Sequence, residues 1–277
     1  MKKFILFYLF VNYNKCGDTM KEIMIITGAS SGIGYETAKA FASCGKNVII
    51  IARRKEKLAK LKKEILEKYP SVKVIVKATD LTKSKNVYQL YDELKSYQLE
   101  TWVNNAGFGN YGSVAEQSLE KVESMIHLNI EALTLFSTLF VHDYKDIEGT
   151  QLINVSSCGG YTIVPTAVTY CATKFYVSTF TEGLARELNS SNAKMQAKVL
   201  APAATKTEFG KIANDVTEYD YDKLFGTYHT SEQMADFLMQ LYNSDKVVGA
   251  VNRETFEFKM FAPLFDYAGN SSHNQKL

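Results

Sequence analysis

The stretch TGASSGIG at residues 27–34 is the strongest fold signal in the sequence, and it directly follows the apolar run IMII at residues 23–26. A strand that ends in such a loop and passes into a helix places backbone amides and the positive end of the helix beside an anion. Glycines let the backbone approach that anion closely. Gly-rich turns also arise where a strand merely packs against a helix, but the position after a first strand favours a dinucleotide pyrophosphate.

Outward from this loop, short runs rich in Ile and Val alternate with longer segments of helical spacing, the pattern of repeated βαβ units. The predicted strands are residues 22–27, 47–52, 72–77, 101–104, 151–155, 195–200 and 246–251. The predicted helices are residues 33–44, 54–68, 83–97, 118–144, 169–189 and 231–243, with Thr82 and Ser118 as N-caps. We therefore predict one doubly wound α/β domain, in which helices cover both faces of a parallel sheet in a three-layer α/β/α arrangement.

Composition excludes several classes of protein. Of the 277 residues, 46% are hydrophobic, which suffices for a sizeable core. The 32 basic residues nearly balance the 30 acidic ones, and they form no single stripe, so charge gives no support to nucleic-acid binding. The cysteines and histidines lack metal-ligand spacing. We expect reduced thiols, no metal and a cytoplasmic protein.

The two ends and one internal segment depart from the alternation. Residues 1–19 have a basic start and an apolar run at 4–11 that imitates a signal peptide, but this run is too short to cross a bilayer and no small-residue cleavage site follows. We expect these residues to be a non-native start, with Met20 as the true one, or a disordered leader. The domain then covers residues 20–269, with an irregular substrate-loop segment at 205–230 and a disordered tail at 270–277.

The end of the second predicted strand indicates which dinucleotide is bound. An acidic residue there would bind an unphosphorylated adenosine ribose, but the sequence reads IIIARRKEKL and offers Arg53 and Arg54. A guanidinium suits a 2′-phosphate, so NADP(H) is predicted over NAD(H). The alternative is that both arginines point into solvent at the start of a helix and bind no ligand.

Over about residues 22–250, several motifs resemble those of the short-chain dehydrogenase/reductase family, in its single-domain form, and they occur in the same order along the chain. They are TGASSGIG, the pair Asp80–Leu81, NNAG at residues 104–107, the catalytic tetrad Asn129, Ser157, Tyr170 and Lys174, and a cofactor-covering loop with Pro202 and Thr207. The resemblance implies a Rossmann fold and a homodimer or homotetramer built on the helices at 118–144 and 169–189. It implies that the cofactor contacts Gly28, Ser30, Ser31, Gly32, Ile33, Gly34, Arg53, Asp80, Leu81, Asn105, Ala106, Gly107, Tyr170, Lys174, Pro202, Thr205 and Thr207. Ala203 departs from the glycine usual after the proline, which narrows the backbone conformations allowed there.

The tetrad residues suit hydride transfer between an alcohol and a carbonyl. Tyr170 and Lys174 are four residues apart, which places them on one helix face, and an ammonium beside a phenol favours the phenolate and lowers its pKa. Tyr170 would exchange the proton, and Ser157 would donate to the substrate oxygen. By the resemblance, Lys174 also binds the nicotinamide ribose and Asn129 holds a water. Taken singly, these residues could be an ordinary helix pair and a strand-end cap.

The residues expected to face the substrate are mostly aromatic: Phe108, Tyr111, Tyr161, Val164, Phe209, Tyr219, Tyr221, Phe225 and Tyr228. Such a pocket suits a small uncharged carbonyl compound, unless some of these rings cover a surface loop or a subunit contact. The predicted function is an NADP(H)-dependent oxidoreductase that is not associated with a membrane. The alternatives are a non-catalytic NADP(H)-sensing protein and a sugar-nucleotide epimerase or dehydratase, which the absence of a C-terminal substrate domain disfavours. Cys158 and Cys171 are expected to be small packing residues rather than a redox switch.

Overall fold

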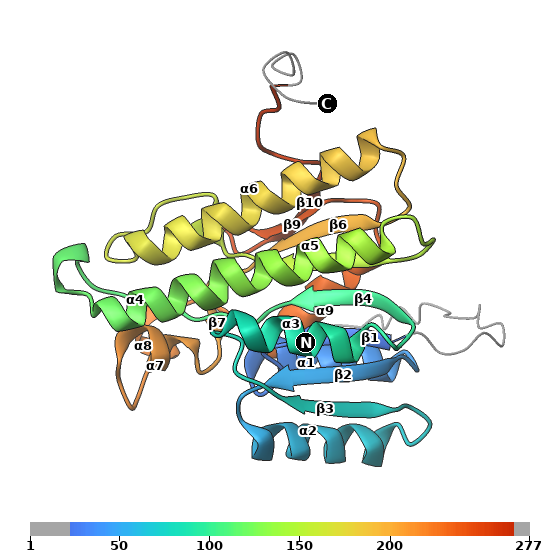
Figure 1. Ribbon diagram of the computed structural model, residues 1–277. Coiled ribbons are helices and arrows are strands. Elements are labelled where there is room, and N and C mark those ends of the chain that lie inside the picture. Colours follow the sequence, from blue (N-terminus) through green and yellow to red (C-terminus); the bar gives the residue numbers. More distant parts are fainter. Residues whose placement is uncertain (1–22, 269–277) are drawn as a thin grey trace, which may run out of the picture.

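The computed structural model describes residues 23–268, so the expectations for residues 1–19 and 270–277 lie outside the described chain. An eight-stranded sheet runs through the molecule in the order β10-β9-β6-β5-β4-β1-β2-β3 (Figure 1). Its strands pair in parallel, except that β10 is antiparallel to β9. The strands are β1 (Ile23–Thr27), β2 (Asn47–Ala52), β3 (Val74–Ala78), β4 (Leu99–Asn104), β5 (Gln151–Val155), β6 (Gln196–Ala201), β9 (Val248–Val251) and β10 (Phe258–Phe261).

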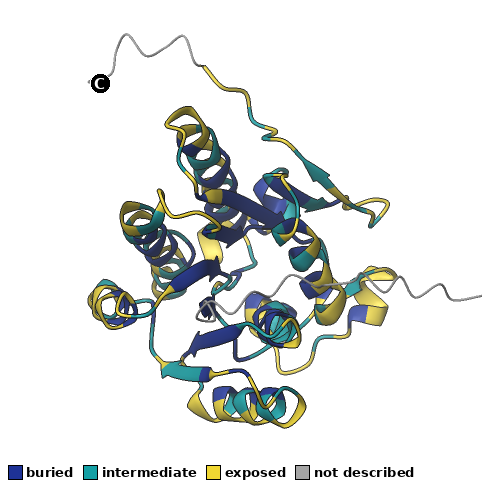
Figure 2. Ribbon diagram, turned by 90° about the vertical axis from the view of Figure 1, so that its right-hand side faces the viewer, coloured by how far each residue is buried: buried dark blue, intermediate teal, exposed yellow. Residues whose placement is uncertain are grey.

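The sheet has one apolar core on each face because successive side chains of a strand point to opposite sides. Met24 and Ile26 pack in the core beneath α1 (Gly32–Ser43), α2 (Lys55–Lys68) and α9 (Ser231–Tyr242). Ile25 packs in the other core, with Trp102, beneath α3 (Ser84–Leu94), α5 (Leu133–Tyr144) and α6 (Val168–Ser190). In Figure 2 the strands are largely buried, whereas the helices expose their outer faces. The predicted doubly wound, three-layer domain is confirmed.

Three local expectations had different outcomes. Ser118 caps α4 (Leu119–Ile126) by accepting a hydrogen bond from the Lys121 amide, as predicted. The N-cap prediction for Thr82 was wrong, because α3 begins after Lys83 and the Thr82 hydroxyl bonds the Asp80 carboxylate instead. Strand β10 was missed, since its four residues join the sheet by backbone pairing with β9 and carry no strong alternation.

The helix predicted at residues 118–144 is continuous but not α-helical throughout. Between α4 and α5 lies the π-helical segment η2 (His127–Ala132), which contains Asn129. By length and composition, the helix from Leu119 to Tyr144 could span a membrane. Here its α5 part instead contributes Phe136 and Phe140 to the core against the sheet.

The irregular segment at 205–230 contains short elements that cover one end of the sheet. These are β7 (Thr205–Lys206), α7 (Phe209–Asn214), α8 (Tyr221–Phe225) and β8 (His229–Thr230), with β7 parallel to β8. Figure 1 shows α7 and α8 beside α4, and Lys121 of α4 pairs with Asp215 just after α7. This lid segment, residues 205–230, lies beyond the carboxyl ends of the strands, where ligands bind in open parallel sheets.

Candidate active site

The loop between β1 and α1 has a backbone that only glycine accommodates well. Gly28 and Gly32 have φ values of +70° and +60°, in the left-handed region that favours glycine. A Cβ on Gly34 would lie 2.8 Å from the Gly28 carbonyl oxygen and closer still to the Asn105 amide nitrogen. The loop therefore combines an exposed helix start with room for close approach by a ligand, as a pyrophosphate requires.

The NNAG stretch holds this loop in place. The amides of Asn105 and Ala106 donate to the Thr27 hydroxyl at 3.0 and 2.9 Å. The Asn105 side chain donates to the Thr27 carbonyl at 2.9 Å. Asn104 ties β4 to β5 through a 3.0 Å bond to Asn154. The glycine loop and the ends of two central strands are thus fixed relative to each other.

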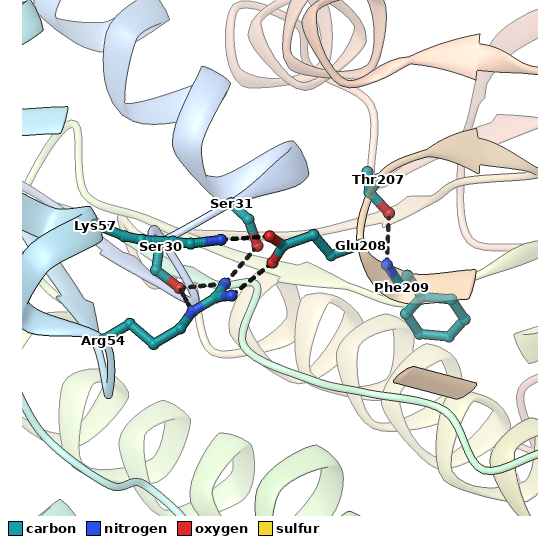
Figure 3. A network of polar contacts seen from close by, with 7 residues as sticks. All are labelled: Ser30, Ser31, Arg54, Lys57, Thr207, Glu208 and Phe209. Carbon is teal, nitrogen blue, oxygen red and sulfur yellow. Dashed lines mark hydrogen bonds and ion pairs between the residues drawn. The ribbon is translucent and has the colours of Figure 1, made fainter. Parts of the chain in front are cut away.

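The basic side chain that reaches the glycine loop is Arg54, whereas Arg53 is exposed. Arg54 Nε and Nη2 lie 3.1 and 2.9 Å from the Ser30 hydroxyl, and Nη2 lies 2.8 Å from the Ser31 hydroxyl (Figure 3). Arg54, which was not among the selected cofactor residues, therefore joins the candidates, while the cofactor contact of Arg53 stays a prediction. Consecutive residues after a strand point in opposite directions, and the sequence offered no means of choosing between two adjacent arginines.

Arg54 and Lys57 form a basic corner beside the glycine loop, and a carboxylate from the lid segment binds both of them. Glu208 Oε2 lies 2.6 Å from Arg54 Nη1, and Glu208 Oε1 pairs with Lys57 of α2 (Figure 3). Burial raises the pKa of Glu208, but hydrogen bonds from Lys57, Arg54 and Ser31 outweigh that effect and lower it to about 2. Neither Lys57 nor Glu208 was among the residues selected from the sequence.

Three of the four tetrad residues meet at the carboxyl end of β5. Ser157 follows β5, and its side chain lies close to Tyr170 of α6. Lys174 lies one turn further along α6, with its Nζ 5.8 Å from the centre of the Tyr170 ring. Lys174 Nζ also donates to the Val155 carbonyl at 2.9 Å. The structure therefore brings together Ser157, Tyr170 and Lys174 as the sequence predicted.

Asn129 fixes the backbone that borders these residues. Its side-chain amide donates to the Phe108 carbonyl at 2.9 Å and to the Thr173 hydroxyl at 3.1 Å, and its oxygen accepts from the Phe108 amide. Gly107 lies between this residue and Lys174, and a Cβ on it would stand 3.0 Å from the Asn129 side-chain oxygen. Asn129 thus connects the π-helical turn, the NNAG loop and α6.

Burial dominates the titration of Tyr170 and Lys174. It raises the pKa of Tyr170 well above its ordinary value, with the hydrogen bond from Ser157 acting in the opposite direction. It lowers the pKa of Lys174 to about 8. The sequence led us to expect a lowered Tyr170 pKa, but in this structure burial disfavours the phenolate and raises it.

A cavity of about 340 Å³ joins the glycine loop to these residues. Of the predicted cofactor residues, its wall includes Gly28, Ser31, Gly32, Ile33, Asn105, Ala106, Gly107, Tyr170, Lys174, Pro202, Thr205 and Thr207. The predicted residues outside that wall are Ser30, Gly34, Arg53, Asp80 and Leu81. Asp80 accepts hydrogen bonds from the Thr82 amide and hydroxyl, and Leu81 is buried.

Six of the nine residues expected to face the substrate line the cavity: Tyr111, Val164, Phe209, Tyr219, Tyr221 and Phe225. The other three do not. The Tyr161 hydroxyl bonds Glu182, the Tyr228 hydroxyl bonds Asp222, and Phe108 packs against the cluster of Met125, Ala167, Tyr170 and Cys171. Arg253 and Phe256, from the β9–β10 connection, also line the cavity and were missed.

Three further side chains have a defined environment near the cavity. Burial raises the pKa of the Cys158 thiol, and Cys171 is buried and accepts a hydrogen bond from the Val164 amide. Both environments suit packing rather than thiolate chemistry. Ala203 is not among the described non-glycine residues with positive φ, so its Cβ imposes no backbone strain.

The site fits a dinucleotide by its own geometry. Two glycines with positive φ and a helix start form the cradle, Arg54 after β2 and Lys57 on α2 supply positive charge, and Lys174 lines the same cavity as the glycine loop. Residues 23–268 contain no group of three or more metal-ligating side chains.

Comparison with known proteins places this site in a family. Residues 22–217 match the family of short chain dehydrogenases. Human dehydrogenase/reductase SDR family member 11 is 28% identical over 219 residues, which are 76% of this chain and 82% of that protein. A 3alpha-hydroxysteroid dehydrogenase from Mediterraneibacter gnavus is 29% identical over 189 residues, 68% of this chain and 75% of that protein.

A solved structure agrees with this assignment. A short-chain dehydrogenase from Sphingobium yanoikuyae, in complex with NADPH, superimposes with a TM-score of 0.75 at 27% identity, covering 82% of this chain and 86% of that one. The family match covers well over half of the chain. This chain belongs to the short-chain dehydrogenase/reductase family of oxidoreductases.

Proposed function

We propose that the protein is an NADP(H)-dependent oxidoreductase that interconverts an uncharged carbonyl compound and its alcohol, with Tyr170 as the acid/base. The observation that carries the proposal is the convergence of Ser157, Tyr170 and Lys174 on the cavity that begins at the glycine loop. When bound, NADP(H) would supply or accept the hydride.

The residues of this chain would divide the remaining work. The amides of the glycine loop and the start of α1 would bind the pyrophosphate, and Lys174 would contact the nicotinamide ribose. Ser157 would donate to the substrate oxygen, which positions it beside the Tyr170 hydroxyl. Tyr170 would give its proton to that oxygen in reduction, and its raised pKa supports this direction because the phenol stays protonated.

The choice of NADP(H) rests on charge at the end of β2. Arg54 and Lys57 carry two positive charges, and Glu208 carries one negative charge, so the corner remains net positive. The NADPH complex of the Sphingobium yanoikuyae relative adds support. Arg54 and Lys57, with Ser30 and Ser31, would hold the 2′-phosphate.

The substrate class rests on the cavity wall. Its far part consists largely of aromatic side chains, including Tyr111, Phe209 and Tyr219, which suit an apolar body with one reactive oxygen. The relative from Mediterraneibacter gnavus, described as a hydroxysteroid dehydrogenase, supports the inclusion of bulky cyclic ketones among the candidates.

The test is consumption of NADPH with a panel of aliphatic, aromatic and cyclic ketones and aldehydes. We expect turnover with at least one of them, and a loss of about a hundredfold to ten-thousandfold in kcat for Tyr170→Phe, the range for removing a proton-transfer group. Tyr88→Phe is the matched control, because Tyr88 is exposed on α3, away from the cavity. Full activity in Tyr170→Phe would refute the assigned role, and tight NADPH binding without any turnover would favour a sensing protein.

A further inference from the structure

Glu208 belongs to the lid segment, and its side chain reaches Arg54 and Lys57. It directly follows Thr207, which lines the cavity, and it is the N-cap residue of α7. Its carboxylate bridges Arg54 at the end of β2 and Lys57 on α2 (Figure 3). A residue of the lid is therefore bound to the two cations that would recognise the cofactor's 2′-phosphate.

The carboxylate occupies donors that a phosphate would need. Arg54 uses Nη1 for Glu208, at 2.6 Å, while Nε and Nη2 are used for Ser30 and Ser31. The Ser31 hydroxyl also lies close to the Glu208 carboxylate (Figure 3). Guanidinium, ammonium and hydroxyl donors around one oxyanion form the same kind of set that binds a phosphate monoester. Glu208 thus acts as an internal anion in a site suited to an external one.

Ionisation makes the two anions exclude each other. The low pKa of Glu208 means that it is negatively charged at any pH at which the protein would work. A 2′-phosphate brings up to two further negative charges to the same donors, whereas the 2′-hydroxyl of NAD(H) brings none. Only the phosphorylated cofactor must therefore displace the carboxylate or tolerate its repulsion.

The lid connects this contact to the catalytic residues. The Thr207 hydroxyl accepts from the Phe209 amide at 3.1 Å, and the Phe209 ring packs on Tyr170 with ring centres 5.3 Å apart. Glu208, which forms the ion pairs at the adenosine end, is therefore directly followed by the residue whose ring contacts the proposed acid/base.

We propose that Glu208 is a specificity-determining residue. Its carboxylate competes with the 2′-phosphate for Arg54 and Lys57, and so reduces the ratio by which NADP(H) binds more tightly than NAD(H). The inference rests on the proposed NADP(H)-dependent function and adds a role for the lid in cofactor choice. Removing the charge of Glu208 should strengthen binding of the phosphorylated cofactor and leave the other unaffected.

The test measures dissociation constants of NADPH and NADH by titration calorimetry, for the full chain and for Glu208→Gln. We expect NADPH to bind about three- to thirtyfold more tightly to Glu208→Gln than to the wild-type chain, because the variant removes one partly exposed negative charge beside the phosphate. The dissociation constant of NADH should change by less than about twofold. Adenosine 2′,5′-bisphosphate and adenosine 5′-monophosphate should show the same contrast, which assigns the effect to the 2′-phosphate. Glu218→Gln is the matched control, an equal charge change at an exposed position of the same lid segment.

The outcomes separate this inference from the function on which it rests. An unchanged ratio of the two dissociation constants in Glu208→Gln overturns the competitor role. A loss of NADH affinity would instead assign Glu208 to ribose binding and also overturns it. If the wild-type chain prefers NADH, the NADP(H) assignment fails, yet a ratio that moves towards NADPH in the variant still supports Glu208. Binding of neither nucleotide overturns both.

Discussion

Burial shifts the two titratable side chains at the cavity floor in opposite directions. Tyr170 keeps its proton more firmly, and Lys174 loses its proton more readily, because both shifts disfavour the charged form. The Lys174 amine retains one strong acceptor, the Val155 carbonyl at 2.9 Å. A neutral phenol beside an ammonium is the protonation state suited to donating a proton to a carbonyl oxygen.

This pair predicts the pH dependence of carbonyl reduction. Lys174 is protonated below its pKa of about 8 and neutral above it, while the raised pKa keeps Tyr170 protonated throughout. We expect kcat/KM to be level on the acid side and to fall as the pH rises through about 8. The measurement is kcat/KM from about pH 6 to about pH 10. Circular dichroism over the same range would show that the chain stays folded, and a level profile up to pH 10 would contradict the assignment.

At the scale of elements, the site is built on the start of helix α1 and on one face of helix α6. Helix α1 begins at Gly32, and its Gly34 packs against the Gly28 carbonyl with no space for a side chain. Helix α6 presents Tyr170 and Lys174 on the face buried against β5 and β6. Its outer face contains Gly183, around which a Cβ would meet no atom within 4 Å.

Two alanine substitutions at helical glycines should have opposite effects on stability. We expect Gly34→Ala to lower the free energy of unfolding by about 1–3 kcal/mol, the usual cost of forcing an atom into a packed site. Gly183→Ala should raise it by up to about 1 kcal/mol, because alanine restricts the unfolded chain and its Cβ enters open space. Urea denaturation of both variants checks this. Equal effects would show that the close contact at Gly34 relaxes without cost.

At the scale of the whole molecule, two apolar cores hold the sheet while the lid segment closes one end. The helix from Leu119 to Tyr144 and helix α6 leave apolar side chains outside both cores. Leu119 is 78% exposed, Val168 is 48% exposed, and Tyr176 stacks on Phe180 at the surface of α6. Large exposed apolar side chains that gather on neighbouring helices are typical of subunit contacts.

A homodimer or homotetramer built on these helices stays a prediction. We expect light scattering at micromolar concentration to give a mass at least twice that of the 31.1 kDa chain. Tyr176→Glu should shift the distribution towards monomer, because it places a charge in the proposed contact, whereas Tyr88→Glu on α3 should not. A monomeric wild-type chain would contradict the prediction.

The amino-acid sequence alone was enough to predict the alternation of the main strands and helices and the glycine loop. These depend on local rules, namely the two-residue period of a strand and the glycine conformations of one short loop. Ser157, Tyr170 and Lys174 were chosen by the family resemblance, to which the spacing of four between Tyr170 and Lys174 added support. Only tertiary structure decided the features that join distant segments. It placed Arg54 against the glycine loop, left Tyr161 and Tyr228 outside the cavity wall, and buried Tyr170, which raises the pKa of its phenol.

Glu208 shows the physical reason most plainly. The end of β2 lacks a carboxylate in the sequence, yet the fold supplies one from 154 positions further along the chain. No periodicity or spacing can indicate such a contact, because it depends on how the lid segment lies across the sheet. Local patterns therefore determined which chemistry this chain carries, and the packing of its segments decided which charges face one another around that chemistry.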